Sequence, residues 1–69
     1  NLLELSDTIY VYERNYLDQK TIVLFNKGVK PVNINLNEDI SAFKQHFNSK
    51  IENNNVTLFP YSFEILTLN

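Results

Sequence analysis

The stretch from Lys20 to Asn26 constrains the fold more than any other part of this sequence. It reads Lys-Thr-Ile-Val-Leu-Phe-Asn, a nearly continuous apolar run that is rich in β-branched residues and is closed by Asn-Lys-Gly. Side chains of a strand alternate between the two faces of a sheet, so one face would carry Thr21, Val23 and Phe25 and the other Ile22 and Leu24. Because both faces are apolar, we expect both to be covered and the strand to be central in its sheet.

The segments before this run are expected to lie beside it. Residues 7–14 alternate, with Ile9 and Val11 on one face and aromatic or polar residues on the other, which predicts a strand. Residues 15–19 form a polar connection of five residues, so the two strands should make an antiparallel hairpin. Residues 1–6 are either a short strand or a linker tail packed on the core.

A glycine and a proline separate the central run from the next predicted strand. Gly28 is the only glycine, and directly after a strand it is expected to supply a positive φ in a turn. Pro31 has no N–H to donate, so it suits the first residue of a strand. The strand that follows alternates apolar residues with asparagine, which predicts one buried face (Val32, Ile34, Leu36) and one solvent face (Asn33, Asn35, Asn37).

The second half of the chain shows shorter apolar runs. Within residues 37–50, apolar residues fit both helical and strand spacing; we expect a loop or single helical turn over 39–43 and a strand over 45–51. A polar turn over 52–55 and a short strand over 56–59 follow. Pro60 and Tyr61 then bend the chain into a last strand, with Phe63 and Ile65 on one face and Leu66 and Leu68 on the other.

Short strands with frequent turns predict an all-β sandwich or barrel, and we expect a small antiparallel Greek-key-like β-sandwich of about six strands. Residues 1–69 are expected to be a single domain. The chain has no methionine, even at position 1, which favours a segment cut from a longer polypeptide.

Composition excludes several classes of partner. The net charge is −2 and the six Lys and Arg residues are scattered, so we expect no nucleic-acid partner. No apolar stretch approaches the roughly 20 residues that cross a bilayer, so no membrane partner is expected. The chain lacks cysteine, which removes disulfides and thiolate metal ligands, and it shows no signal peptide. A cytoplasmic, bacterial location is the expectation.

Three stretches resemble successive strands of one enzyme family. Residues 9–14, Ile-Tyr-Val-Tyr-Glu-Arg, look like the first strand of the C-terminal β-domain of family 13 glycoside hydrolases, where an aromatic residue lies two positions before an arginine. Residues 21–26 resemble its second strand, an apolar run ending in asparagine, and Pro31-Val32 fits the third. Residues 58–66 resemble the closing motif Leu-x-Pro-Tyr with its final hydrophobic strand, and Phe47-Asn48-Ser49 sits where the family often has Leu-x-Ser-Asn.

The resemblance covers about residues 3–68 and is greatest to the α-glucosidase, oligo-1,6-glucosidase and phosphotrehalase group. It implies a non-catalytic accessory domain of a retaining α-glycosidase, which packs on and stabilises an N-terminal catalytic (β/α)8 barrel. The barrel of the same polypeptide would be its partner. The catalytic carboxylates of the family lie in the barrel, so neither a catalytic residue nor a cofactor or metal site is expected in this part.

The residues themselves offer few candidates for chemistry. Glu38 and Asp39 are the only adjacent acidic pair, and a solvated loop or helix N-terminus explains them. His46 is the single histidine, and one imidazole makes neither a triad nor a metal site. Arg14 is expected to pair with Glu13 or with a carboxylate across the sheet. An enzyme in its own right is therefore the least supported interpretation.

Four tyrosines are the remaining candidates, because an aromatic face can stack on a sugar ring while the hydroxyl forms a hydrogen bond. Two hypotheses use them. As parts of an accessory domain they would belong to an exposed apolar patch that docks the barrel. In the alternative, a carbohydrate-binding module for α-glucan oligosaccharides, two or more of them would be exposed and coplanar. The candidates are Tyr10, Tyr12, Tyr16 and Tyr61.

Overall fold

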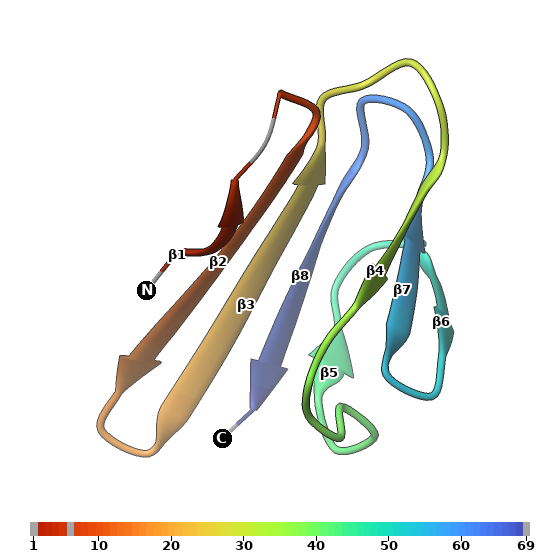
Figure 1. The fold of residues 1–69 in the computed structure, drawn as a ribbon. Helices are drawn as coiled ribbons and strands as arrows, with labels where there is room; N and C mark the ends of the chain where they lie inside the picture. Colours follow the sequence, from red (N-terminus) through yellow and green to blue (C-terminus); the bar gives the residue numbers. More distant parts are fainter. Residues whose placement is uncertain (1, 6, 69) are drawn as a thin grey trace.

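The structure is a computed structural model that describes residues 2–5 and 7–68. These residues form two antiparallel sheets that pack as a small sandwich (Figure 1). One sheet has the strand order β1-β2-β3-β8-β5, and the other has the order β4-β7-β6. The strands are β1 (Leu2–Leu5), β2 (Ile9–Tyr16), β3 (Gln19–Asn26), β4 (Val32–Asn35), β5 (Lys44–Gln45), β6 (Lys50–Glu52), β7 (Asn55–Leu58) and β8 (Phe63–Leu68).

The predicted all-β sandwich is confirmed, with eight strands among the described residues where about six were expected. The chain crosses between the two sheets four times, from β3 to β4, from β4 to β5, from β5 to β6 and from β7 to β8. Strand β8 therefore returns late in the sequence to pair with β3, which is the Greek-key-like feature of the fold (Figure 1).

The predicted central position of β3 is confirmed, because it pairs with β2 on one side and β8 on the other. Its even-numbered side chains lie on the inner face of the sheet, where Ile22, Leu24 and Asn26 are buried. The apolar side chains among them join a core from both sheets, made of Val11, Ile22, Leu24, Ile34, Leu36, Ile40, Val56, Leu58 and Leu66. The expectation of two covered faces holds on this inner face only, since Thr21, Val23 and Phe25 on the outer face are half-buried.

The β2–β3 hairpin is tighter than the sequence indicated. Tyr16 pairs with Gln19, so the turn consists of Leu17 and Asp18 rather than the five residues expected. Leu17 adopts a left-handed φ of 55°, which a tight two-residue hairpin requires. The expectation was wrong because backbone pairing continues through exposed polar residues. In such residues the side-chain polarity does not show whether the backbone is in a strand or a loop.

Gly28 corrects a second expectation, because its φ is not positive. A Cβ at this position would lie 3.1 Å from two carbon atoms of Thr8 and 3.2 Å from Asn26 Oδ1. The glycine is therefore needed for close approach of the loop to its neighbours rather than for an unusual backbone angle.

The segment over 45–51 corrects a third expectation. A loop with one turn, in which Phe43 N–H donates to the Ile40 carbonyl, precedes it as predicted. The single expected strand is instead two short ones: β5 pairs with β8 in the first sheet, and β6 pairs with β7 in the second. The four residues between them cross from one sheet to the other.

The β4 strand, in contrast, has the predicted buried Ile34 and exposed asparagines.

Candidate functional site

The outer face of the five-stranded sheet carries an apolar surface. Cross-strand register places Tyr10 opposite Phe25 and Phe25 opposite Phe63, and in the next row Tyr12 opposite Val23 and Val23 opposite Ile65. Neighbouring side chains on one face are the contacts that stabilise a sheet, and here they extend over three strands. We define the outer apolar face as Tyr10, Tyr12, Val23, Phe25 and Ile65.

The outer face of the sheet is apolar around Tyr10 and Tyr12 and becomes polar toward the β2–β3 turn. The row beyond Tyr12 is polar, since Arg14 lies opposite Thr21 and Thr21 opposite Thr67. Arg14 thus faces away from Glu13, which binds Lys20 on the inner side of the sheet. Of the two partners expected for Arg14, Glu13 is therefore wrong, because adjacent residues of a strand point to opposite faces. Directly across the sheet Arg14 meets Thr21 and not a carboxylate.

The four candidate tyrosines lie in three places. Tyr10 and Tyr12 are neighbours on the outer face, with ring planes 9° apart and centroids at 6.3 Å, and both are half-buried. Tyr16 is at the tip of the β2–β3 hairpin and is 62% exposed. Tyr61 is in the turn before β8 and is 66% exposed. The structure thus brings together two of the four.

A shallow groove of about 240 Å³ lies where the turn before β8 meets the crossing between β5 and β6. We call it the end groove. Phe47 and Phe63 are in contact within it, with ring centroids 4.6 Å apart, and each is more than 40% exposed. Phe63 also meets Phe25 edge-on at 6.4 Å, so the end groove adjoins the outer apolar face. Its lining consists of Phe47, Asn48, Ser49, Phe59, Tyr61, Ser62 and Phe63.

Glu64 is completely buried and holds one wall of the end groove. Its carboxylate accepts hydrogen bonds from the backbone N–H groups of His46 (3.1 Å), Phe47 (2.7 Å) and Ser49 (3.2 Å). The Gln45 side-chain amide (2.8 Å) and the Ser49 hydroxyl also donate to it. The His46 N–H also donates to the Ile65 carbonyl of β8 at 3.1 Å, but the N–H groups of Phe47 and Ser49 are directed to the Glu64 side chain, which explains why the expected strand over 45–51 is interrupted there.

The charge state of Glu64 follows from these contacts. Burial alone would raise the pKa of its carboxyl group, but hydrogen bonds from Ser49, Gln45 and Phe47 outweigh burial and hold the pKa below its ordinary value. A buried carboxylate is tolerated only where donors replace its hydration, and here five groups from residues 45–49 do so.

Asn26 is also completely buried, and it holds the opposite wall. Its side-chain amide donates to the carbonyl oxygens of Lys30 (2.8 Å), Leu58 (3.2 Å) and Phe59 (3.2 Å), and its side-chain oxygen accepts from Gly28 N–H. Its backbone N–H donates to the Ser62 carbonyl at 2.9 Å. The end of β3 is thereby fixed to the turn that contributes Phe59 and Tyr61 to the groove.

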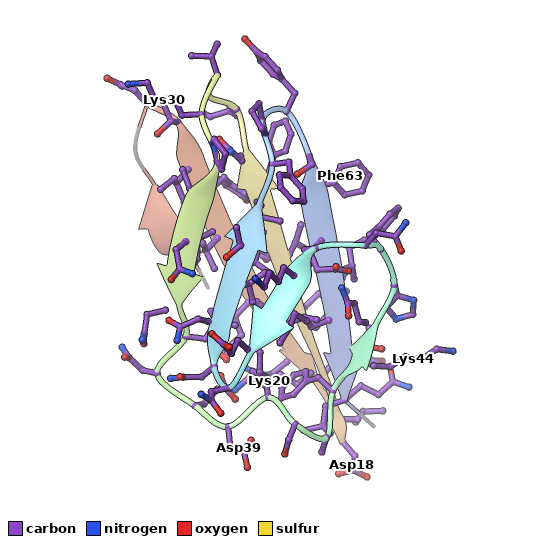
Figure 2. All side chains as sticks on the ribbon, turned by 90° about the vertical axis from the view of Figure 1, so that its right-hand side faces the viewer. Asp18, Lys20, Lys30, Asp39, Lys44 and Phe63 are labelled. Atoms are coloured by element: carbon purple, nitrogen blue, oxygen red, sulfur yellow. The ribbon has the colours of Figure 1, made fainter. Side chains whose placement is uncertain are left out.

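A cluster of charged groups lies at the other end of the sandwich. Lys20 Nζ lies 2.8 Å from Glu13 and 2.8 Å from Glu38, and these two carboxylates raise the pKa of Lys20. Figure 2 shows Lys20 and Asp39 at the end opposite to Phe63. Asp39 is exposed and accepts a hydrogen bond from Ser41 N–H, which lowers the pKa of Asp39. The solvated-loop interpretation of the acidic pair therefore holds for Asp39, whereas Glu38 is half-buried and bound to Lys20.

His46 is exposed directly after β5, and its Nε2 lies 2.8 Å from the Thr67 hydroxyl. Among residues 7–68, no three His, Asp or Glu side chains come together as a metal site would require. The described part of the chain also has no helix of the length and apolarity needed to cross a bilayer.

The sequence interpretation missed Glu64, Asn26 and three phenylalanines of the end groove. A signal was present for the first two. Glu64 shares the inward face of the last strand with Leu66 and Leu68, and Asn26 shares the face of Ile22 and Leu24. A polar side chain at an inward position of an alternating strand predicts a buried polar group with several partners. The phenylalanines come together only through the crossing between sheets, which no local pattern reports.

Comparison with protein-family models, with curated proteins and with solved structures gives no match to this chain.

Proposed function

We propose that this chain is a non-catalytic accessory domain of an α-glycosidase, which packs on and stabilises the catalytic (β/α)8 barrel of the same polypeptide. The observation that carries the docking role is the outer apolar face. The second sheet covers the inner face of the five-stranded sheet, while Tyr10, Tyr12 and Val23 on the outer face keep part of their surface accessible. Contiguous apolar surface of this kind marks an interaction site.

The identity of the partner rests on the motif resemblance. The three longer motifs fall in β2, in β3 and in the turn and strand of β8, and these are the three central strands of this sheet. Pro31-Val32 opens β4 in the other sheet, whereas Phe47-Asn48-Ser49 lies between β5 and β6 and not in a strand. A supporting rather than a catalytic role fits the carboxylates of residues 7–68: Glu64 is held in hydrogen bonds, Glu13 and Glu38 are bound to Lys20, and the others lie on the exposed surface. In this role the domain contributes apolar contact area and needs no cofactor.

The hypothesis of a tyrosine platform for α-glucans has weaker support in the geometry. A stacking platform needs exposed ring faces in one plane, whereas Tyr16 and Tyr61 lie at different ends of the sandwich and Tyr10 and Tyr12 stack on each other. Rings that cover each other have less face to offer to a sugar.

The docking proposal is tested by binding of the 69-residue chain to the separately expressed remainder of its polypeptide. Val23→Lys places a charge in the centre of the outer apolar face, and Val29→Lys is the matched control on an exposed loop residue. We expect Val23→Lys to weaken binding by about tenfold or more, and Val29→Lys to leave it within about twofold. Equal affinities for the two variants would contradict docking through this face.

A further inference from the structure

We propose that the end groove is a binding site for one uncharged pyranose ring. This site is separate from barrel docking, although it adjoins the outer apolar face through Phe63. Three observations support the proposal: the shape and lining of the groove, the fixation of both walls, and the absence of charge in the lining.

The groove has the dimensions and surfaces for a single ring. Its volume of about 240 Å³ is below the roughly 300–1,000 Å³ of pockets for drug-sized molecules, so it suits one ring rather than several. Phe59 is 55% exposed and Tyr61 66% exposed, while Phe47 and Phe63 are exposed at 43% and 44%. Aromatic surface left open at this level, on both sides of a groove, is available for stacking.

Both walls are fixed before any ligand arrives. Asn26 and Glu64 are the two fully buried polar side chains among residues 7–68, and each holds one wall. Glu64 fixes residues 45–49, and Asn26 fixes the turn at Phe59. Buried polar groups are costly unless they are fully bonded, so their placement behind the two walls gives a preformed groove rather than a chance depression.

The turn that carries Tyr61 is also strained in a defined way. Tyr61 has a φ of 58°, a left-handed conformation that is uncommon for a bulky residue and costs on the order of 1 kcal/mol. Ser62 holds the turn, since both its backbone N–H and its hydroxyl donate to the Phe59 carbonyl, at 3.1 Å and 2.6 Å. This conformation orients Tyr61 toward solvent beside the groove.

The lining decides the chemical class of the ligand. None of its seven residues carries a charge and the Glu64 carboxylate lies behind one wall, so a phosphate or a carboxylate would lose its hydration there without a positive partner. The Asn48 amide and the hydroxyls of Ser49 and Ser62 lie beside the aromatic rings. A pyranose ring matches this combination, because it has an apolar C–H face for stacking and hydroxyl groups for an amide or hydroxyl.

The test is a two-dimensional amide NMR titration of the 69-residue chain with maltose up to about 50 mM, where weak single-ring binding is detectable. We expect saturable shifts confined to residues 45–49 and 59–64. Tyr61→Ala should weaken binding about fivefold, and Asn48→Ala, which leaves the aromatic rings in place, about two- to threefold. Tyr16→Ala is the matched control, since Tyr16 is almost equally exposed at another end of the molecule, and it should leave binding unchanged.

Three results would overturn the proposal. Absence of shifts from a folded sample would exclude maltose as a groove ligand and with it a pyranose site of useful affinity. Shifts that move with protein concentration rather than with maltose would assign the groove to a second copy of the chain. Shifts caused by a proline-rich peptide but not by maltose would assign it to an extended peptide, which also docks in aromatic grooves. Val23→Lys should leave maltose binding intact, so failure of this site and failure of barrel docking are distinguishable.

Discussion

The two faces of the five-stranded sheet differ in how completely the chain closes them. On the inner face, Ile22, Leu24 and Leu66 are sealed by the second sheet, and the polar groups there are all bonded within the molecule. On the outer face, Val23 and Ile65 lie on the same strands but remain half-buried. Alternate residues of one strand thus meet different surroundings: the inner face specifies the fold, and the outer face is the one that we propose for recognition.

The largest difference should appear between neighbouring residues of β3. Leu24→Ala removes a fully buried side chain and should lower the free energy of unfolding by about 2–5 kcal/mol. Val23→Ala removes a half-buried side chain and should cost about 1 kcal/mol or less. Urea denaturation of both variants measures the contrast. Similar losses for the two would mean that the faces are equally important for folding.

Glu64 tests the polar part of the inner face. Glu64→Gln keeps the size of the side chain but replaces an acceptor with an N–H donor that faces other donors, so the free energy of unfolding should fall by about 2–3 kcal/mol. Glu52→Gln, an exposed acid on β6, is the control and should change stability by less than about 0.5 kcal/mol. A neutral Glu64→Gln would show that the carboxylate does not hold residues 45–49.

Because of the Glu64 carboxylate, we expect the free energy of unfolding to decrease at acid pH. Its pKa is lower in the folded chain than the ordinary value of 4.5, so its contribution is complete above that value and is lost as pH falls through the folded pKa. Thermal melts across about pH 2–7 should therefore show a decline beginning below about pH 4.5. The decline should be smaller in Glu64→Gln, and an identical decline in both proteins would assign it to other carboxylates.

The smallest effect on the free energy of unfolding is expected at Lys20, which binds Glu13 and Glu38 at the solvent-accessible edge of the inner face. Solvent reaches this cluster, so Lys20→Met should cost about 1 kcal/mol or less, and added salt should reduce the difference from the parent. The pKa of Lys20 is raised, so its contribution is complete below the ordinary value of 10.5 and is lost as pH rises through the folded pKa. Loss of several kcal/mol would place Lys20 in the core rather than at its edge.

The contrast between the faces also explains what could be predicted from the sequence. Alternation located β2, β3, β4 and β8 because each of these strands has one face that must be buried. It placed Phe63 and Ile65 on the opposite face from Leu66 correctly, and it placed β3 at the centre. What it reports is the period of burial along a single strand.

The errors occurred where long-range contacts replace local pattern. The strand expected over 45–51 is divided because its N–H groups bond to Glu64, which lies at least 15 residues further along the chain. The requirement for glycine at position 28 comes from the close approach of Thr8, and the end groove forms where two turns distant in the sequence meet. Local sequence contains the donors and acceptors but not their pairing.

The central claim is that the outer apolar face is reserved for a partner, and it is tested most directly by measuring one substitution in two contexts. The free energy of unfolding of Val23→Lys should be compared in the 69-residue chain and in the full-length polypeptide that contains it. We predict a loss of about 1 kcal/mol or less in the chain alone, and a further loss of about 2 kcal/mol or more in the full polypeptide, where the lysine would be buried against the barrel. The same small loss in both contexts would contradict the claim.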